Sequence, residues 1–194
     1  ATPAEGQALW GYATAAAGLA IAVLAPVLGA IADRTGARKP WIAAFSVPFV
    51  FGCGLLYFSV PGAPGGIAIA LVGFAIATLG VEFATVFTNA MMPDLVPRQR
   101  LGRLSGSGWA TGYAGGLVSL VIALGLMAAN PETGRTLLGF EPILGLDPVL
   151  REGDRASGPF SALWYLVFVL PLFLLYFVAN SIAINAFNRV TVAG

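Results

Sequence analysis

The stretch GAIADRTGARKPW, from Gly29 to Trp41, gathers four charged side chains into a short segment between two long apolar runs. In the whole chain 10% of the residues are charged and 58% are hydrophobic, with a mean hydropathy of +0.85, whereas soluble domains carry about 25% charged residues. Charged turns between apolar runs are typical of a chain that crosses a membrane and turns back. The composition therefore predicts an integral membrane protein in the lipid bilayer, and it argues against a soluble or nucleic-acid-binding fold.

The side-chain inventory excludes several kinds of chemistry. The chain has one cysteine, Cys53, and no histidine. Metal sites built on nitrogen or sulfur ligands are therefore nearly excluded, and a Ser–His or Cys–His nucleophile pair is excluded outright. The sequence also lacks a phosphate-cradling glycine loop. We expect no cofactor, no metal and no enzyme; an intramembrane enzyme is the weakest interpretation of the sequence.

Five segments are long and apolar enough to cross a membrane. A helical span needs about 20 mostly apolar residues, whereas a membrane strand is shorter and alternates in polarity. The predicted fold class is therefore all-α integral membrane, with one helical bundle over residues 1–181 and a cytoplasmic tail or inter-half linker at 182–194. The spans are expected at residues 8–32, 41–60, 67–92, 104–129 and 160–181, with an outer loop at 130–158.

The charges of the connecting segments predict the orientation, because short loops rich in Lys and Arg stay in the cytoplasm. The connections at 33–40 and 93–103 are basic, whereas the connection at 61–65 carries no charge. We therefore expect the first two inside and the third outside, with the amino end of the chain outside and its carboxyl end cytoplasmic. The charged residues of the second inner loop are Asp94, Arg98, Arg100 and Arg103.

Asp33 is not explained by the positive-inside rule. A carboxylate at the carboxyl end of a helix lies against the negative end of the helix dipole, so it costs stability unless something compensates it. One interpretation is an exposed ion pair with Arg34 or Arg38, worth about 0–1 kcal/mol. A second interpretation follows from a family resemblance.

Gly29-Ala30-Ile31-Ala32-Asp33-Arg34-Thr35-Gly36, followed by Arg38-Lys39, resembles the signature loop of the major facilitator superfamily, which joins the second and third helices of each transporter. Ala37 departs from the pattern, because a basic residue is usual there. The resemblance implies that Gly29 allows close helix approach and that Asp33 engages a helix end and basic residues of the opposite half. Such a contact biases a two-state equilibrium. The predicted conformational-switch loop consists of Gly29, Asp33, Arg34, Gly36, Arg38 and Lys39.

The segment NAMMPDLVPRQRLGRLSGSGWATGYAGG, residues 89–116, resembles the vacuole-effluxer (autophagy-related) branch of that family and its bacterial relatives. The resemblance implies that the five spans correspond to helices two to six of twelve. The chain has no initiating Met, so we expect a fragment, the partial N-terminal half of a transporter, whose partners are the missing first helix and second half. The high Ala and Gly content suggests a bacterial inner membrane.

Glu82 is the only charged residue deep within a span. It lies about 15 Å from the cytoplasmic end at 1.5 Å per residue, near the midplane, where an ionisable group is costly and faces the bundle interior or water. Helical spacing places three polar residues on its face, which are Thr78, Thr85 and Asn89. Either Glu82 takes part in proton coupling or substrate binding, or it is a structural residue hydrogen-bonded to a neighbouring helix.

Gly108, Gly112 and Gly116 repeat at every fourth position. A stripe of small residues lets two helix backbones approach closely. We therefore predict that these three glycines pack against a second helix.

Taken together, these features predict a secondary transporter that moves a small solute by alternating access. Amino acids are the leading substrate class, because the effluxer resemblance implies them. The alternative is a non-transporting membrane scaffold or a remnant that needs a partner chain, since five helices alone cannot enclose a pathway between two halves.

Overall fold

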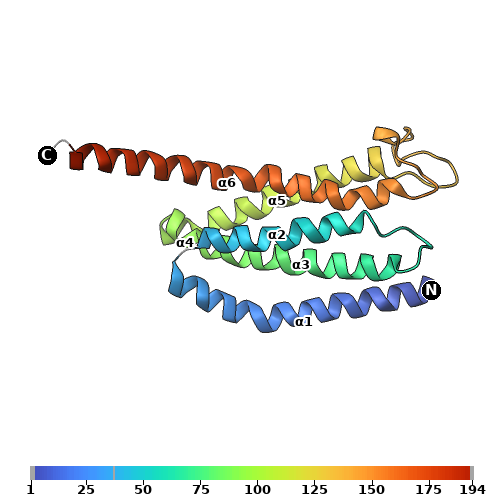
Figure 1. The fold of residues 1–194 in the computed structure, drawn as a ribbon, viewed down its shortest axis with the longest axis horizontal. Coiled ribbons are helices and arrows are strands. Elements are labelled where there is room, and N and C mark those ends of the chain that lie inside the picture. Colours follow the sequence, from blue (N-terminus) through green and yellow to red (C-terminus); the bar gives the residue numbers. More distant parts are fainter. Residues whose placement is uncertain (1–2, 37, 193–194) are drawn as a thin grey trace. The chain divides into compact units, whose positions relative to one another are not determined.

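Figure 1 shows the computed structural model of the chain, in which helices dominate. The structure describes the backbone of residues 3–36 and 38–192 and the side chains of residues 4–36 and 38–175. Ala37 and the last two residues of the predicted tail therefore lie outside the described residues. The chain forms two compact units, residues 1–162 and 163–194, and each is considered by itself.

The elements follow one another as a series of helices joined by turns and one long loop. In order they are α1 (Pro3–Thr35), α2 (Arg38–Leu56), α3 (Gly66–Ala90), α4 (Met92–Leu95), the 3₁₀ turn η1 (Arg98–Arg100), α5 (Leu101–Ile122), the π-helical turn η2 (Ala123–Met127), the 3₁₀ turn η3 (Ile143–Gly145) and α6 (Glu152–Val192). The second unit is the remainder of α6.

The predicted all-α membrane fold is confirmed. Within the described residues the extended structure is an isolated bridge between Ala129 and Thr136. In the part of the chain whose side chains are described, five stretches are long and apolar enough to cross a membrane, which are Ala4–Thr35, Arg38–Leu56, Gly66–Leu95, Arg98–Met127 and Glu152–Leu175.

Several helix ends differ from the predicted span ends. Helix α1 begins at Pro3, five residues before the predicted start at residue 8, and α6 continues to Val192, so the predicted tail or linker at 182–194 is helical over its described backbone. The end of α2 and the start of α6 differ because of local hydrogen bonds. Helix α2 stops at Leu56 because the backbone tightens there: the Phe58 N–H bonds the Leu55 carbonyl at 3.0 Å, and an irregular turn follows. Helix α6 begins at Glu152, inside the predicted outer loop, because Asp147 organises the preceding turn. Its carbonyl accepts the Glu152 N–H at 3.0 Å, and its carboxylate accepts the Val149 N–H at 2.7 Å.

Helix α3 lies between α1 and α2 and forms the centre of the first unit (Figure 1). The backbones of α2 and α3 come very close at glycines. A Cβ built at Gly52 would lie 2.5 Å from the Ala77 amide nitrogen, and one built at Gly80 would lie 2.5 Å from the Phe49 nitrogen. No larger residue fits at either position without moving a helix, so these glycines determine the separation of the two helices.

Aromatic rings fill the α2–α3 interface near the start of α2. The Trp41 ring stacks on the Phe87 ring, with centroids 5.4 Å apart and planes 6° apart. The Phe45 ring lies 5.2 Å from that of Phe83 and 5.8 Å from that of Phe87. Because lipid supplies no hydrophobic driving force between helices, such van der Waals packing is what holds α2 and α3 together.

The first turns of α6 belong to the first unit and are attached to the end of α2. The Arg155 Nε donates to the Tyr57 carbonyl at 2.7 Å, and its guanidinium lies 4.9 Å from the centre of the Tyr57 ring. A Cβ at Gly158 would collide with the Cys53 carbonyl oxygen. A charged group, a ring and a close backbone approach therefore fix the beginning of α6 on α2.

Candidate functional site

The turn between α1 and α2 is shaped by Gly36. Its φ of 63° is left-handed, a conformation that side chains other than glycine's rarely adopt. The Gly36 N–H bonds the Ala32 carbonyl at 3.2 Å, and the Gly36 carbonyl accepts the Arg38 N–H at 3.2 Å. This cap ends α1 and starts α2 within three residues, which fixes where the charged side chains of the predicted switch loop leave the backbone.

The predicted switch loop is linked to the second inner loop by an ion pair. The Arg38 Nη1 donates to the Asp94 Oδ2, between the start of α2 and α4. The Arg38 side chain is 16% exposed and that of Asp94 is 66% exposed, and the Arg38 Nε is buried without a hydrogen-bond partner among the described residues. Solvent reaches Asp94, so the pair is worth about 0–1 kcal/mol and joins the loops without locking them.

Asp33 is exposed and forms no ion pair or hydrogen bond with any described residue. The local ion pair considered from the sequence is therefore absent here, because Arg38 points to Asp94 instead and Arg34 lies exposed. A Cβ built at Gly29 meets nothing within 4 Å, so the close approach that the resemblance implies has no partner in the described part of the chain. The role of Asp33 as a switch stays a prediction.

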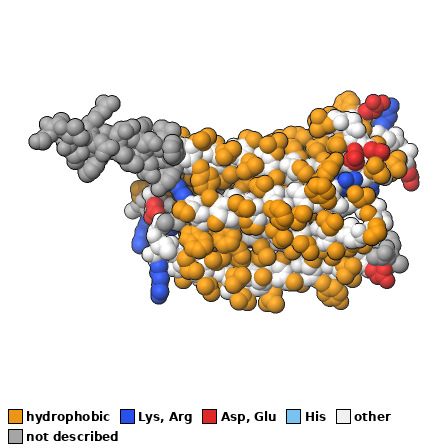
Figure 2. Space-filling view, in the orientation of Figure 1, with side chains coloured by type: hydrophobic (Ala, Val, Ile, Leu, Met, Phe, Trp, Pro, Cys, Tyr) orange, Lys and Arg blue, Asp and Glu red, His pale blue; other side chains and the backbone are white. Residues whose placement is uncertain are grey.

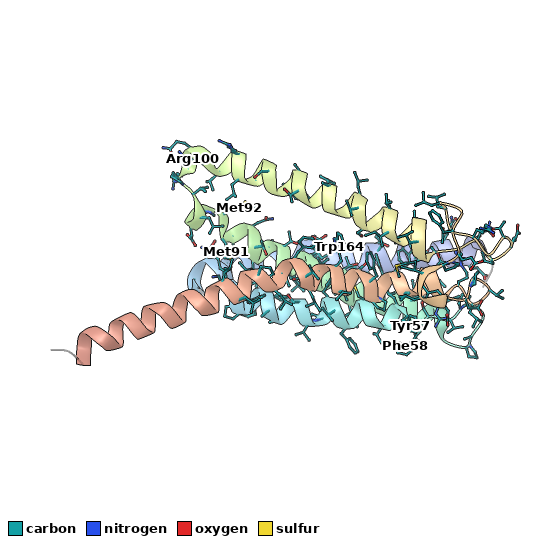
Figure 3. The ribbon with its side chains drawn as sticks, turned by 90° about the horizontal axis from the view of Figure 1, so that it is seen from above. Tyr57, Phe58, Met91, Met92, Arg100 and Trp164 are labelled. Carbon is teal, nitrogen blue, oxygen red and sulfur yellow. The ribbon has the colours of Figure 1, made fainter. Side chains whose placement is uncertain are left out.

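The basic residues of the two predicted inner loops gather at one end of the helices, whereas Arg135, Arg151 and Arg155 lie at the other end beside acidic residues. Arg98, Arg100 and Arg103 are exposed, and on the face shown in Figure 2 Lys and Arg side chains cluster beside α4 while the middle is hydrophobic. Figure 3 places Arg100 at the opposite end from Tyr57 and Phe58, which follow α2. We call the end that carries α4 the inner end and the opposite one the outer end.

Glu82 lies on the side of α3 that faces away from α2. It follows Gly73 by nine positions, about 180° around the helix axis, and Gly73 is buried against α2. Its side chain is exposed and has no ion pair or hydrogen bond with the described residues. A carboxyl group so deep in a span must face water or another protein segment, and no described residue supplies the partner that a structural role would need.

The polar stripe around Glu82 is continuous but chemically mixed. All its members lie within α3, and Asn89 is exposed like Glu82. The Thr85 hydroxyl donates to the Val81 carbonyl at 2.8 Å, which satisfies it within its own helix. Thr78 is half-buried. Asn89 and Glu82 are therefore the members best placed to bind something outside the helix, and the described residues contain no cluster of three or more His, Cys, Asp or Glu side chains fit for a metal ion.

The glycine stripe of α5 has no partner among the described residues. A Cβ built at Gly108, Gly112 or Gly116 meets nothing within 4 Å. No residue of α5 is buried, and its main contacts are with α4, η1 and η2, which flank it in the chain. Close packing at this stripe stays a prediction for a segment outside the described residues.

Sequence reasoning missed the glycines that do pack. Gly73, Ala77 and Gly80 put small residues on one face of α3, which is the same signal as in α5, yet only the structure places Gly52 of α2 against it. Arg155 was also missed, because a charged residue of a predicted loop gives no sign that it will bond the Tyr57 carbonyl. The helical spacing of Gly73 and Gly80 could have identified the first interface.

Five apolar helices, charged inner turns and a glycine-packed helix pair define a multi-pass membrane protein of the helical-bundle class. Residues 4–120 match the family model of the Major Facilitator Superfamily, and the chain belongs to this superfamily. It is similar to the uncharacterized MFS-type transporter YxiO of Bacillus subtilis (strain 168), with 25% identity over 193 residues, 96% of this chain and 42% of the relative. The chain thus spans less than half the length of that relative. No solved structure matches it significantly.

Proposed function

We propose that this chain is part of a secondary transporter that moves a small solute across a membrane by alternating access. Membership of the Major Facilitator Superfamily supports this function. The observation that carries it is the joining of the switch loop to the second inner loop by Arg38 and Asp94, while Asp33 beside them is left exposed. The acidic group of the second inner loop, Asp94, is engaged within the chain, and that of the switch loop, Asp33, is available to another segment.

The switch works by a contact that forms in one state and breaks in the other. Asp33 engages a helix end and basic residues of the opposite half when the inner side is shut, as the family resemblance implies. A ligand or contact shifts a two-state equilibrium only by its differential affinity for the states. A contact worth about 1.4 kcal/mol in one state alone shifts the populations about tenfold.

The proposal extends to the substrate class, amino acids, and to the energy source, a coupled proton. Amino acids are the first solutes to test, and export is the first direction, because of the resemblance of residues 89–116 to the vacuole-effluxer branch. Glu82 is the candidate proton carrier, since it is an unpaired carboxyl group in a span, and Asn89 on the same face is a candidate substrate ligand. The inner end faces the cytoplasm of a bacterium in this proposal, because basic loops remain there.

The test is solute flux in liposomes that contain the complete native protein. Asp33→Asn keeps the size of the side chain and removes its charge, so we expect lower flux and a changed labelling rate of cysteines placed at the inner end. Glu141→Gln is the matched control, because Glu141 is exposed in the outer loop and forms no ion pair with the described residues. Flux that is equal in the two variants would refute the switch role, and no flux of any amino acid in the native protein would refute the substrate class.

A mass measurement separates this function from the scaffold alternative. A native protein near twice the 20.0 kDa of this chain provides a second half for Asp33 to meet. A native mass near 20.0 kDa without self-assembly favours a non-transporting scaffold or remnant.

A further inference from the structure

The loop after α5 folds back against the outer end of its own helix. The Leu137 N–H donates to the Leu124 carbonyl of η2 at 3.1 Å. The Leu138 side chain packs on Gly125, where an added Cβ would lie 2.8 Å from the Leu138 Cδ1. The segment of residues 136–140, which we call the loop tip, is therefore held beside the last turn of the span.

The position of Leu124 along the span gives the depth of the loop tip. Leu124 follows Arg103 by 21 positions, which is about 31 Å along a helix at 1.5 Å per residue. The hydrocarbon core of a bilayer is about 30 Å thick. With Arg103 at the inner boundary, the loop tip lies at the outer boundary between acyl chains and headgroups.

The loop tip is apolar where it is exposed. Leu137 is 78% exposed, Leu138 54% and Phe140 57%. These side chains continue an apolar surface over the end of α5 and η2, where Val121 and Leu124 are also exposed. Exposing three large apolar side chains within five consecutive residues to water is unfavourable.

The backbone of the loop tip is largely satisfied by internal hydrogen bonds. The Thr136 N–H bonds the Phe140 carbonyl at 2.9 Å, and the Gly139 N–H bonds the Thr136 carbonyl at 2.9 Å. The Arg135 Nη1 donates to the Gly139 carbonyl at 2.8 Å. Non-helical backbone near lipid needs such internal partners, because acyl chains offer none.

We propose that the loop tip inserts into the outer leaflet of the bilayer, with Leu137, Leu138 and Phe140 among the upper acyl chains. Arg135 forms no ion pair with the described residues, and its guanidinium is held at the Gly139 carbonyl of the loop tip, which leaves its other N–H groups for lipid phosphates at the same depth. An apolar body with an arginine at its edge is the usual arrangement of an interfacial anchor. The lipid surface is favoured over a protein partner because the loop tip is continuous with a membrane span.

The test is the accessibility of spin labels on the complete protein in liposomes. Single cysteines replace Leu137 or Phe140 in a Cys53→Ala background, with Glu132→Cys as the control in the exposed turn just before the loop tip. Oxygen partitions into acyl chains and a nickel chelate stays in water. We expect oxygen to relax the labels at 137 and 140 more than nickel does, and the order to reverse at 132.

Two results would overturn the insertion. Strong nickel relaxation at 137 and 140 would mean that the loop tip lies in water. Weak relaxation by both reagents would mean that protein covers it, either another segment or a second copy. Should the labelled variants fail to fold, Leu137→Trp in liposomes of lipids brominated near the headgroup gives a second readout: strong quenching supports insertion, and quenching no greater than in unbrominated lipids contradicts it.

Discussion

The close approach of α2 and α3 leads to a prediction about Gly52. In Gly52→Ala the added Cβ would lie 2.5 Å from both the Ala77 nitrogen and the Gly73 carbonyl oxygen. Ordinary contacts of carbon atoms are about 3.5–4.0 Å. Both obstacles are backbone atoms that cannot rotate away, so the helices must separate locally by about 1 Å to restore ordinary contact.

This separation has a cost that can be bounded. A gap of 0.5–1 Å forfeits about a quarter to a half of each neighbouring van der Waals contact, and the buried cluster of Cys53, Ala77 and Ala162, with Phe49 and Val50 packed on it, spans the interface. Overpacking of this kind typically costs about 1–3 kcal/mol. We therefore expect Gly52→Ala to have a free energy of unfolding lower by about that amount than a Gly→Ala variant of the same helix without a clash, or about 5- to 150-fold in the unfolding equilibrium.

Gly54→Ala is the matched control, because Gly54 lies two positions further along the same helix and its added Cβ meets nothing within 4 Å. The gain in helix propensity from Gly to Ala, about 0.5–1 kcal/mol, is common to both variants. The measurement is reversible unfolding of the complete protein in mixed micelles, titrated with dodecyl sulfate. Equal stability of Gly52→Ala and Gly54→Ala would refute the reasoning that backbone contact sets the helix separation.

Three further predictions concern the inner end, the span carboxyl group and α5. A double-mutant cycle of Arg38→Ala and Asp94→Ala on unfolding should give a coupling energy of about 0.2–1 kcal/mol, as for other solvent-exposed pairs; strictly additive effects would argue against the ion pair. Glu82→Gln should abolish proton-driven accumulation in liposomes while downhill exchange of the same solute continues, and unchanged accumulation would exclude proton coupling at this residue. Gly112→Leu should disrupt assembly of the complete protein on size-exclusion chromatography, because the side chain would block a close helix approach; normal assembly and transport would contradict close packing there.

The membrane spans follow from the sequence, because a span is recognised by the summed hydropathy of its own residues and not by its neighbours. The apolar runs predict all five spans, most ends of the first four lie within five residues of the observed helix ends, and the basic turns predict which ends lie together. The fifth span is longer than predicted at both ends. The helix ends after Leu56 and before Glu152 depend on hydrogen bonds of single turns. Hydropathy does not report such bonds.

The candidate site is only partly predictable for a different reason. Spacing alone places Glu82 and Asn89 on one face of a helix, and the structure adds that this face points away from α2. The partner of Arg38 could not be read from spacing, because Asp94 lies 56 residues away. From the sequence alone, Asp33 is the expected partner of Arg38, because it is nearer in the chain.

The sequence by itself determined that this chain is a membrane protein of several helices with a charged turn of the Major Facilitator Superfamily, since composition and motif need no knowledge of neighbours. Tertiary structure decided which helix faces meet. Gly73 and Gly112 carry the same small-residue signal, yet α2 covers the first and no described residue covers the second. The signal permits close approach, but only the arrangement of the helices supplies the second backbone.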